Sequence, residues 1–543
     1  MKVFSVAEMV AAEKAADAAD GAGGLSYAQM METAGKSVAE AVIARWPVEE
    51  RTITVLIGPG NNGGDGLVAG RYLAQAGADV TFYLFKERDP EKDTNLAKVM
   101  EMGLFVLNAS FDQRYRVLRT RLNITDIVID ALLGTGVSRP IGGELAKLMG
   151  QVQAGLDERR QILAEKQRAI LTSTAALDAP PASEAFRQPI VVAVDCPSGL
   201  NCDNGAIDPL AVAADLTVTF AGPKRGHFVF PGAGYCGELV VADIGIDPKL
   251  PEVSEVGLEL VTADTARSLL PPRPSDGHKG TFGSVLVAAG SANYWGAPFL
   301  AGKAAYRVGA GLVALAVPTA NRPSLATQLP EATYPPISAE DVLDAESARS
   351  LFDNLTSYQS LLVGPGVNGA DDFLTTLLTA ESLPLLVIDA DGLNILSRQD
   401  NWPELLPPNT ILTPHPGEMA RLMGVSLSAL KEMERVGLAQ KQAAEWGCVV
   451  LLKGAYTVVA GPDGRCALLP FANPALAVAG SGDVLSGIIA GLLGQGLASF
   501  EAAVLGGYLH GAAATAVGLD SGLLAGEISD QLPLVRQRMM AMK

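Results

Sequence analysis

A glycine-rich turn near the C-terminal end of the chain carries a single carboxylate. Residues 478–487 read Val-Ala-Gly-Ser-Gly-Asp-Val-Leu-Ser-Gly, and Asp483 stands where this turn opens an apolar helix. Free backbone N–H groups at the start of a helix attract phosphate. An aspartate beside them can take the proton of a hydroxyl that attacks phosphorus. The run therefore indicates phosphoryl transfer, although a glycine-rich helix start can also be only a tight turn.

A second glycine-rich run follows an apolar segment in the N-terminal half. Residues 53–57 are Ile-Thr-Val-Leu-Ile, and residues 58–66 are Gly-Pro-Gly-Asn-Asn-Gly-Gly-Asp-Gly. We expect a strand, then this loop and then a helix, and ligands of open parallel sheets bind beyond the carboxyl ends of the strands. Asn61, Asn62 and Asp65 add polar side chains to a turn that glycine and asparagine could form alone. The run predicts a binding site at this strand end.

Asp130 and Asp195 each end a predicted apolar strand. A carboxylate in such a place is costly unless it binds something. Because several strand ends can converge on one crevice, Asn62, Asp130 and Ser198 could offer hard oxygen ligands to a simple cation. The sequence shows no cluster of histidine and cysteine, so we do not expect a transition metal.

The C-terminal half holds several short polar motifs, and each follows an apolar strand or precedes a helix. They include Gly366, Asp389-Ala-Asp391, Thr413-Pro-His415-Pro-Gly-Glu418 and Lys453-Gly-Ala-Tyr-Thr457. All of them could face one pocket together with the Asp483 turn. Lys453, next to a glycine, could contact phosphate or could be a solvated lysine at a strand end. His415 could likewise contact a ligand or cap a turn.

Strand-like segments separated by helical ones must position these motifs. In the N-terminal half, short β-rich runs alternate with helical patterns, at residues 53–57, 80–85, 127–130, 190–195 and 216–220. The C-terminal half starts the alternation again, with buried-strand candidates at residues 284–288, 312–317, 361–363, 385–388 and 449–452. This alternation predicts parallel sheets with helices on both faces, and hence the α/β class.

A chain of 543 residues exceeds one hydrophobic core, so we expect two domains. Proline-rich punctuation at residues 248–255 and 271–274 places the boundary near residue 250. The expected domains are residues 1–250 and residues 251–543. Residues 151–189 interrupt the N-terminal alternation with a charged helical piece and an Ala/Ser/Pro-rich stretch, and we expect a surface excursion there.

The charge balance argues against some kinds of partner. Lys and Arg number 41 and Asp and Glu number 59, so the net charge of −18 disfavours a nucleic-acid or anionic-membrane surface. The five cysteines are scattered, as in proteins with free thiols in a reducing compartment. The first residues lack signal-peptide order, and the apolar stretch 484–498 is short and interrupted by glycines. We therefore expect a buried helix there, no membrane span and a cytoplasmic protein.

Residues 1–248 resemble the NAD(P)HX epimerase family, which interconverts the R and S forms of hydrated NADH and NADPH. The resemblance rests on residues 58–66, 130–140, 195–199 and 214–223. It implies a Rossmann-like three-layer sandwich and a potassium ion on Asn62, Asp130 and Ser198. It also implies a set of residues that bind the hydrated nucleotide: Asn61, Asn62, Gly63, Gly64, Asp65, Gly134, Thr135, Gly136, Val137, Ser138, Arg139, Pro140 and Asp195.

Epimerisation at a carbon that bears a hydroxyl next to a ring nitrogen needs a proton to be lost or transferred reversibly. Asp195 is our candidate for the catalytic acid or base, and the loop amides would hold the phosphates. In this reading residues 1–250 form the epimerase domain.

Residues 255–543 resemble the ADP-dependent NAD(P)HX dehydratase family, a branch of the ribokinase-like α/β fold. The strongest markers are residues 413–418, 453–457 and 473–483. The resemblance implies that ADP and its product AMP are bound by Lys453, Gly454, Ala455, Tyr456, Thr457 and Gly482. It implies that the hydrated cofactor contacts Ala297, Gly366, His415 and Asp483. Residues 251–543 would then be the dehydratase domain.

The dehydratase family phosphorylates the hydroxyl of the hydrate from ADP and then eliminates phosphate. Asp483 would be the catalytic base that deprotonates the hydroxyl, while the amides of residues 480–482 neutralise the transferring phosphoryl group. Magnesium fits this chemistry, although the sequence shows no dedicated carboxylate cage for it.

Together the two resemblances predict a bifunctional enzyme of nicotinamide nucleotide repair. It would epimerise R- and S-NAD(P)HX and dehydrate the S form to NAD(P)H at the expense of ADP, which becomes AMP and phosphate. Two alternatives stay open: a C-terminal kinase for a small hydroxymethyl compound and an N-terminal interaction scaffold. The expected partners are NADHX or NADPHX, ADP and further copies of the chain, because small-residue helices such as residues 302–311 could support close subunit packing.

Overall fold

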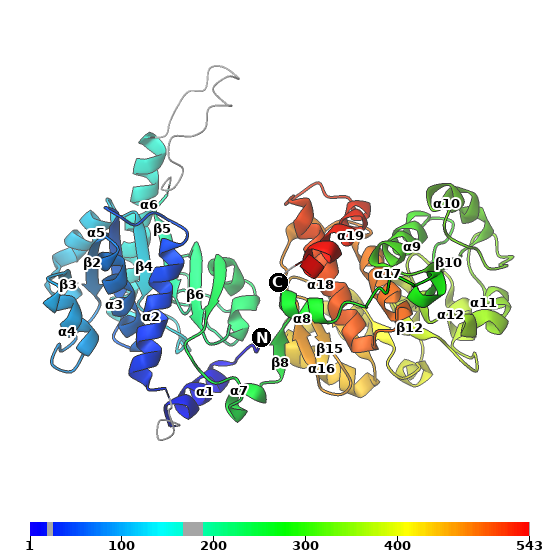
Figure 1. Cartoon of the computed structure of the whole chain (residues 1–543), viewed down its shortest axis with the longest axis horizontal. Coiled ribbons are helices and arrows are strands. Elements are labelled where there is room, and N and C mark those ends of the chain that lie inside the picture. The colour runs from blue at the N-terminus through cyan, green and yellow to red at the C-terminus, as the bar shows by residue number, and fades with distance from the viewer. Residues whose placement is uncertain (19–24, 167–187, 542–543) are drawn as a thin grey trace, which may run out of the picture. The chain divides into compact units, whose positions relative to one another are not determined.

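The computed structural model describes residues 1–18, 25–166 and 188–541, with the backbone alone at residues 162–166. The chain forms two compact units (Figure 1), one of residues 2–256 and one of residues 257–543 together with Met1. The charged first part of the expected surface excursion belongs to helix α6 (Gly143–Lys166). Its Ala/Ser/Pro-rich part lies outside the described residues.

The N-terminal unit is built on a seven-stranded sheet in which every pairing is parallel. The strand order β3-β2-β1-β4-β5-β6-β7 contains the 3-2-1-4-5-6 order of doubly wound nucleotide-binding folds. The predicted Rossmann-like α/β fold is therefore confirmed, with β3 and β7 as strands that we did not predict. The strands are β1 (Thr52–Ile57), β2 (Asp79–Leu84), β3 (Phe105–Asn108), β4 (Ile127–Ala131), β5 (Ile190–Val194), β6 (Leu216–Phe220) and β7 (Glu238–Ala242).

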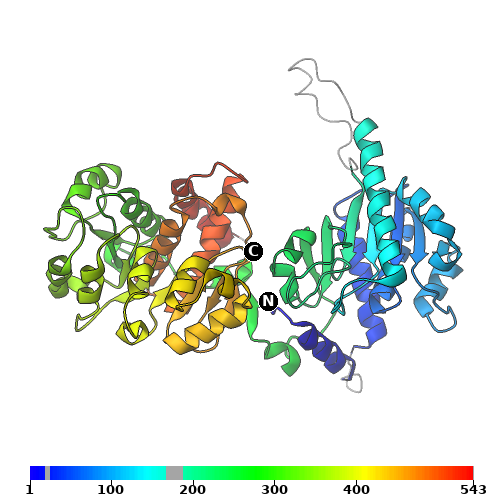
Figure 2. The same cartoon turned by 180° about the vertical axis from the view of Figure 1, so that it is seen from behind.

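Helices cover both faces of this sheet (Figure 1, Figure 2), because alternate strand residues point to opposite sides. Val55 joins an apolar core with α2 and α3, whereas Leu56 joins a second core with α5 and α6. Two cores on two faces give the predicted three layers. Besides α6, the helices are α1 (Val6–Ala18), α2 (Tyr27–Ile43), α3 (Asn61–Gln75), α4 (Thr94–Glu101), α5 (Arg116–Leu122) and α7 (Pro251–Ser254).

The segment that follows residue 250 belongs by its packing to the N-terminal unit. Val253 on α7 and Val256 form a small apolar cluster with Phe4, Met9 and Ala12. Because these contacts tie α7 to α1, the division between the two units falls after residue 256.

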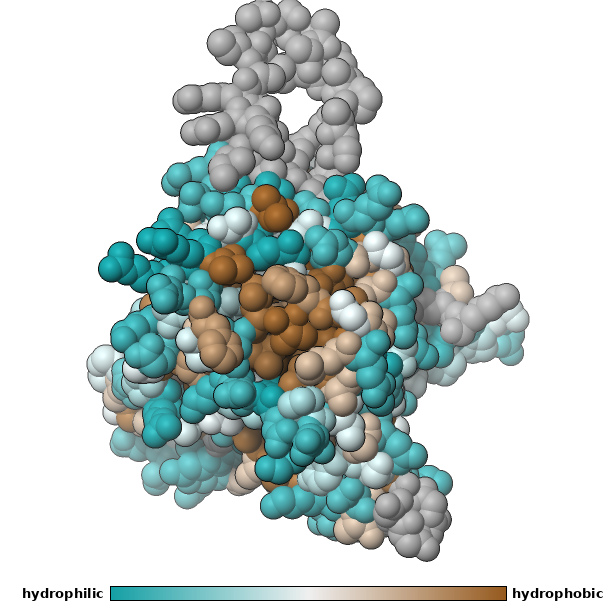
Figure 3. All heavy atoms as spheres, turned by 90° about the vertical axis from the view of Figure 1, so that its left-hand side faces the viewer, coloured by the Kyte–Doolittle hydropathy of each residue, from teal (hydrophilic) through white to brown (hydrophobic). Residues whose placement is uncertain are grey.

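The β3 edge of the N-terminal sheet carries exposed apolar side chains. Figure 3 views the molecule from the side on which β3 lies in Figure 1 and shows apolar groups gathered there. The exposed apolar residues between the end of α4 and the start of β4 include Met100, Met102, Phe105, Phe111 and Ile124. Among the described residues no strand pairs with the outer side of β3, so this sheet edge is open.

The C-terminal unit holds a nine-stranded mixed sheet of order β10-β9-β11-β12-β13-β14-β15-β16-β8. The pairings from β10 to β14 are parallel, and β15 runs antiparallel to both β14 and β16. We did not predict β8, β13, β15 and β16, which have only two or three residues each. The strands are β8 (Leu258–Leu260), β9 (Ser284–Ala288), β10 (Leu312–Ala316), β11 (Ser360–Val363), β12 (Leu385–Ile388), β13 (Ile411–Leu412), β14 (Val449–Leu452), β15 (Val458–Ala460) and β16 (Cys466–Leu468).

Helices also enclose the second sheet, with Val285 in the core on one face and Leu286 in the core on the other. This agrees with the α/β fold expected for the C-terminal half. The helices are α8 (Ala263–Ser268), α9 (Gly296–Val308), α10 (Arg322–Gln328), α11 (Ala345–Leu351), α12 (Asp371–Leu377), α13 (Asp391–Leu396), α14 (Pro416–Leu422), α15 (Leu427–Lys431), α16 (Arg435–Trp446), α17 (Ser481–Gly494), α18 (Ser499–Val517) and α19 (Ala525–Ala541).

Helix α17 is buried from Val484 to Gly494 and packs closely on α9. Gly487 permits this approach, because a Cβ there would lie 2.3 Å from the carbonyl oxygen of Ala301 on α9. The predicted buried helix is confirmed, and none of the helices in the described residues combines the length and apolar character that a bilayer span requires. The small residues of α9 pack inside their own unit, so the expected homo-oligomer stays a prediction without that support.

Candidate active sites

The first candidate site begins where β1 ends and α3 starts. Gly58 packs against the end of β4, because a Cβ on it would lie 1.8 Å from the carbonyl oxygen of Leu132. Helix α3 already begins at Asn61, with Gly60 as its N-cap, so the polar residues form its first turns and not the loop that we expected. Arg88, which the sequence did not single out, donates from Nη1 to the carbonyl oxygens of Gly58 (2.7 Å) and Gly60 (3.1 Å).

The three residues expected to hold potassium lie together near the carboxyl ends of β1, β4 and β5. Asp130 accepts hydrogen bonds from the hydroxyl (2.6 Å) and the backbone N–H (2.8 Å) of Ser198. Asn62 donates from its amide nitrogen to the carbonyl oxygen of Leu133 (2.9 Å). Its buried Oδ1 has no hydrogen-bond partner among the described residues.

The chemistry of this group fits a hard monovalent cation. Burial raises the pKa of Asp130, although hydrogen bonds from Ser198 oppose the rise. A cation in contact with the carboxylate would remove that cost. The unpartnered Oδ1 of Asn62 would supply a further oxygen ligand of the kind that such ions prefer.

A cavity of about 750 Å³ opens beside this group. Asn61, Asn62 and all of residues 134–140 line it, so the structure brings together two of the segments predicted to bind the nucleotide. Phe85 and Lys86 also line it and were not predicted. The remaining residues that we predicted to bind the nucleotide do not form its wall: Gly63, Gly64, Asp65 and Asp195.

Asp195 lies in a separate polar cluster, where Lys224 binds it. Nζ of Lys224 is 2.6 Å from Oδ1 of Asp195 and also donates to Oγ1 of Thr219 (2.8 Å) and to the carbonyl oxygen of Phe220 (3.2 Å). The lysine is fully buried, and the aspartate side chain is 14% exposed. Burial by itself would raise the pKa of Asp195, but Lys224 and Thr219 outweigh it and hold that pKa below its ordinary value.

The charges of this cluster also affect the pKa values of two other carboxyl groups. Burial raises the pKa of Asp65 well above its ordinary value, and the negative charges of Asp195 and Glu13 raise it further. Burial also raises the pKa of Glu13 on α1. Sequence reasoning missed Glu13 and Lys224, and the one available signal was that Lys224 directly follows the family-like segment 214–223. The cluster therefore combines one firmly ionised carboxylate with two carboxyl groups that retain protons more readily.

The second candidate site forms at the N-terminal end of α17. Gly480 caps the helix with a φ of 87°, a conformation that favours glycine, and Asp483 lies in the first turn. A Cβ on Gly482 would lie 3.5 Å from Nζ of Lys453 and 3.8 Å from Oδ2 of Asp389. The turn therefore meets side chains from the carboxyl ends of β14 and β12.

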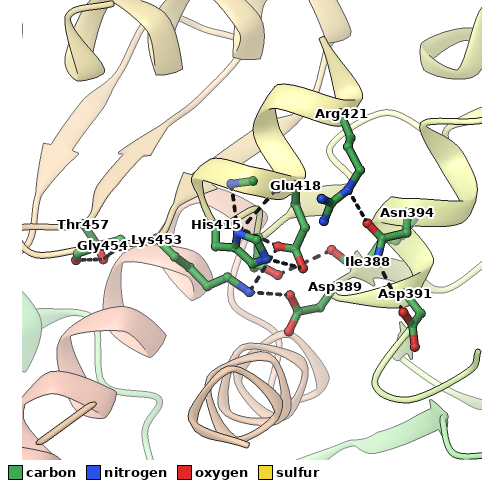
Figure 4. Close-up of polar contacts among 12 residues, drawn as sticks. Ile388, Asp389, Asp391, Asn394, His415, Glu418, Arg421, Lys453, Gly454 and Thr457 are labelled. Atoms are coloured by element: carbon green, nitrogen blue, oxygen red, sulfur yellow. Dashed lines mark hydrogen bonds and ion pairs between the residues drawn. The ribbon is translucent and has the colours of Figure 1, made fainter. Parts of the chain in front are cut away.

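Lys453 is the centre of a buried ion-pair network (Figure 4). Its Nζ lies 2.7 Å from Oδ1 of Asp389 and 3.7 Å from Oε2 of Glu418. The side chains of Lys453, Asp389 and Glu418 are 18%, 1% and 6% exposed, so the alternative of a solvated lysine is wrong. Burial lowers the pKa of Lys453, but the two carboxylates outweigh it and raise that pKa, so the ammonium group stays charged.

Two carboxyl groups of this site have pKa values near neutrality. Burial and the negative charge of Asp389 raise the pKa of Asp483 to about 7, against the opposing effect of Lys453. Burial also raises the pKa of Glu418 to about 7. Groups that change charge near neutral pH are typical of proton-transfer sites. Asp389 and Glu418 belonged to motifs that we singled out, but only the fold reveals their contacts with Lys453.

His415 caps helix α14. Its Nδ1 accepts the backbone N–H groups of Gly417 (2.9 Å) and Glu418 (3.4 Å), and Oε2 of Glu418 accepts the backbone N–H of His415 (2.8 Å). The capped turn that we left as an alternative is therefore present. The ring is still 49% exposed, so it can also contact a ligand. Burial is the largest cause that lowers the pKa of His415, and the ring is neutral at pH 7.

The other two residues expected to face the hydrated cofactor are neighbours. Gly366 follows β11, and a Cβ on it would lie 3.2 Å from Cβ of Ala297 at the start of α9. Tyr294 is closer still, with its Cβ 2.5 Å from the same point. A side chain at Gly366 would therefore collide with Tyr294, and the backbone of residue 366 can approach Ala297 closely only because it is glycine.

The segment expected to bind ADP, residues 453–457, is the turn between β14 and β15. Thr457 stabilises it by accepting from the backbone N–H of Gly454 (3.3 Å) and donating to its carbonyl oxygen (2.8 Å). Arg435 on α16, which we did not predict, donates from Nη1 to the carbonyl oxygen of Ala455 (2.7 Å). These contacts hold the turn in one conformation next to Lys453.

Both units match known protein families. Residues 27–226 match the model of the YjeF-related protein N-terminus, and residues 285–534 match that of NAD(P)H-hydrate dehydratase. The chain is 40% identical over 530 residues to the bifunctional NAD(P)H-hydrate repair enzyme Nnr of Moorella thermoacetica, across 93% of this chain and 92% of that protein. It is 31% identical over 493 residues to the protein of the same name from Escherichia coli K12, across 90% and 85% of the two chains.

Among solved structures, an ADP/ATP-dependent NAD(P)H-hydrate dehydratase from Bacillus subtilis, co-crystallised with ATP and Mg²⁺, is 34% identical to this chain. That alignment covers 52% of this chain and 98% of the other, with a TM-score of 0.45. The sequence relatives extend through both units at 31–40% identity. On this evidence the chain belongs to the family of bifunctional NAD(P)H-hydrate repair enzymes.

Proposed function

We propose that this chain repairs hydrated nicotinamide nucleotides in two successive steps, one in each unit. The N-terminal unit interconverts the R and S forms of NADHX or NADPHX. The C-terminal unit dehydrates the S form to NADH or NADPH and converts ADP to AMP and phosphate. Family membership supports both activities. The observation that carries the proposal is the meeting of Asp483, Lys453 and Gly482 at the start of α17, where a base, a cation and backbone donors come together.

In the C-terminal unit, ADP binds to residues 453–457 and Gly482. Asp483 accepts the proton of the substrate hydroxyl while the hydroxyl oxygen attacks the β-phosphorus of ADP. The new O–P bond forms as the bond to the bridging oxygen breaks, and AMP leaves. A pKa of about 7 allows Asp483 to take this proton near neutral pH. Lys453 and the N–H groups of residues 480–482 offset the charge on the transferring phosphoryl group.

The phosphorylated intermediate then loses phosphate. The C–O bond breaks as the lone pair of the ring nitrogen forms a C=N bond, and the neighbouring ring carbon then releases a proton to restore the dihydronicotinamide. The substrate ring lies against Ala297, Gly366 and the exposed part of His415. Since the imidazole is neutral at pH 7, it adds no charge that would resist formation of the cationic ring.

Magnesium would bind in this unit chiefly through the phosphates of the nucleotide. In the part of the chain that the structure describes, no group of three or more His, Cys, Asp or Glu side chains is arranged to hold a metal ion. Mg²⁺ commonly keeps several waters and takes only one or two protein carboxylates beside substrate phosphates. When bound, the ion would neutralise phosphate charge, and Asp389 and Asp483 are the carboxylates nearest to the turn.

In the N-terminal unit, the cavity beside Asn61 takes the nucleotide, and the backbone N–H groups at the start of α3 bind its phosphates. Helix α3 connects this cavity to the polar cluster around Asp195, because Asn62 lines the cavity and Asp65 lies one turn further along the helix. Asp195, held ionised by Lys224, accepts a proton from the substrate, and Asp65 can return one.

Potassium on Asn62, Asp130 and Ser198 would supply positive charge close to the phosphates of the epimerase substrate. These residues offer a carboxylate, a hydroxyl and an amide oxygen from three different segments. By holding these residues together, the bound ion would fix the position of the start of α3 relative to the cavity wall.

The test is to incubate the purified protein with mixed R and S hydrates, with and without ADP, and to separate the products by chromatography. Without ADP, either pure epimer should relax to the same mixture. With ADP, both epimers should disappear as the absorbance of reduced nicotinamide returns and phosphate is released. Asp483→Asn should lose the ADP-dependent step and keep epimerisation, and Asp195→Asn should do the reverse. A stable phosphorylated product would contradict the proposal and indicate a kinase.

We also propose that the protein acts in a reducing compartment, with the cytoplasm as its expected location. All five cysteines are buried and none forms a disulfide in the described residues, which supports this choice. The homo-oligomer stays a prediction, and size-exclusion chromatography coupled to light scattering measures it directly.

A further inference from the structure

A pocket of about 510 Å³ in the C-terminal unit contains two arginines that the proposed mechanism does not use. Its polar lining consists of Asn368, Asp391, Asn394, Ser397, Arg398 and Arg421. The lining carries two arginines against one aspartate, whereas the chain as a whole has a net charge of −18. Such a pocket suits an anionic group of a ligand.

Three features connect this pocket to the proposed substrate site. Asn368 follows Gly366 by two residues. Asp391 is near enough to Asp483 for its charge to contribute to the raised pKa of that group. Arg421 lies beside His415, because the point that a Cβ on Gly417 would occupy is 2.8 Å from Cε1 of His415 and 3.8 Å from Nη1 of Arg421. The pocket is therefore a continuation of the site that contacts the hydrated cofactor.

Asn394 holds the guanidinium group of Arg421 in place (Figure 4). Nε of Arg421 donates to Oδ1 of Asn394 (2.8 Å), and Nδ2 of Asn394 donates to Oδ1 of Asp391 (3.3 Å). Within the described residues, the two Nη nitrogens of Arg421 form no hydrogen bond and no carboxylate pairs with them. Arg398 differs, since its Nε donates to Asp371 (3.1 Å) and its charge is offset.

We propose that Arg421 binds a phosphate group of the hydrated dinucleotide while the damaged ring lies against His415 and Asp483. This inference rests on the proposed dehydratase function. A guanidinium group fixed through Nε keeps its two Nη groups for bidentate contact with phosphate. Two phosphate groups have this chemistry: the pyrophosphate of both substrates and the 2′-phosphate of NADPHX. Arg421 thus sets the affinity for the dinucleotide and takes no part in the chemical step.

The test is steady-state kinetics of ADP-dependent dehydration with S-NADHX and with S-NADPHX. Arg421→Ala should raise KM for the dinucleotide by about 10- to 100-fold, the effect of losing a charge-assisted hydrogen bond, with kcat and KM for ADP unchanged. Arg421→Lys should retain part of the affinity, because lysine keeps the positive charge but cannot make the bidentate contact with phosphate. The matched control is Arg349→Ala, which removes an exposed arginine from a separate pocket of the same unit and should change none of these constants.

The two substrates distinguish the two phosphate groups. An equal rise in KM for both substrates assigns the pyrophosphate, and a rise for S-NADPHX alone assigns the 2′-phosphate. Unchanged KM values for both substrates in Arg421→Ala, with an active wild type, would overturn the inference and leave the proposed function intact. A wild type without ADP-dependent dehydration would overturn the proposed function itself.

Discussion

At the scale of single residues, Asp483 as the proposed base should determine how the ADP-dependent step responds to pH. A base must be ionised, so the rate should be lost as pH falls through the pKa of about 7 and should level off above it. We expect kcat/KM for the S hydrate to fall about tenfold per pH unit on the acid side. Initial rates between about pH 5 and pH 9 measure this profile.

Glu418 titrates in the same range, so the apparent pKa belongs to the coupled pair. The control is Glu418→Gln, which removes one of the two titrations and should keep an acid limb from Asp483. A profile in the wild type that stays flat across neutral pH would show that Asp483 is not the base.

Lys224 illustrates how one residue sets both stability and chemistry in the N-terminal unit. Removal of one partner from a buried ion pair costs about 3–5 kcal/mol, so Lys224→Met should lower the free energy of unfolding by a few kcal/mol. In the wild type, folding lowers the pKa of Asp195. The ion pair therefore stabilises the fold at pH values above the pKa of this aspartate in the unfolded chain, and the stabilisation is lost as acid protonates Asp195 in the folded protein. In the variant, burial raises the pKa of Asp195 and the hydrogen bond from Thr219 opposes it only in part, so stability should fall as pH rises instead.

Urea unfolding at several pH values measures this change. The matched control is Lys36→Met on α2, where a half-exposed lysine pairs with Glu40 and the loss should be below about 1 kcal/mol. Equal losses in the two variants would contradict the assigned role of Lys224.

At the scale of elements, the packing of α17 on α9 fixes the position of the helix that carries Asp483. Gly487→Ala would place a Cβ 2.3 Å from the carbonyl oxygen of Ala301, and the helices would have to separate. We expect a loss of about 1–3 kcal/mol and reduced ADP-dependent activity, because Asp483 lies one turn away on the same helix. Thermal unfolding measures the loss. The control Gly257→Ala, where nothing lies within 4 Å, should leave the melting temperature unchanged.

The carboxyl ends of β1, β4 and β5 position the three residues of the proposed potassium site. Replacement of potassium chloride by tetramethylammonium chloride should lower the epimerase rate and the melting temperature of the N-terminal unit, because the cation that offsets the Asp130 carboxylate is then absent. Asn62→Ala, which removes an amide oxygen, should show a much smaller response to the change of salt. Asp483→Asn is the control and should respond like the wild type. Equal epimerase rates in the two salts would argue against a bound potassium ion.

At the scale of the whole molecule, the two sites belong to separate compact units, and each has its own acidic group. The two activities should therefore complement each other between molecules. Asp195→Asn alone should leave R hydrate unrepaired, and Asp483→Asn alone should form no NAD(P)H. An equimolar mixture of the two variants should repair R hydrate completely when ADP is present, because the S form can diffuse between molecules. If the mixture produced no NAD(P)H from R hydrate, the two sites would have to act within one chain.

Much of the fold was predictable, and the misses have physical causes. Continuous apolar strands such as residues 449–452 were located correctly, since a run of buried residues is a local pattern. Strand β13 was missed because two residues make no such pattern, and its place in the sheet depends on β12 and β14. The early start of α3 at Asn61 was missed because glycines disfavour a helix unless, as here, the packing requires them.

The amino-acid sequence by itself determined the family, the α/β class and the segments that we propose carry the chemistry, because glycine turns, strand periodicity and family motifs are local patterns in the chain. Only the tertiary structure decided which side chains meet. Lys453 and Asp389 are 64 residues apart in sequence, yet their charged atoms are 2.7 Å apart. Ionisation also follows from burial and neighbouring charges, which exist only in the fold. Asp195 and Asp483 therefore look alike as sequence and differ as acids.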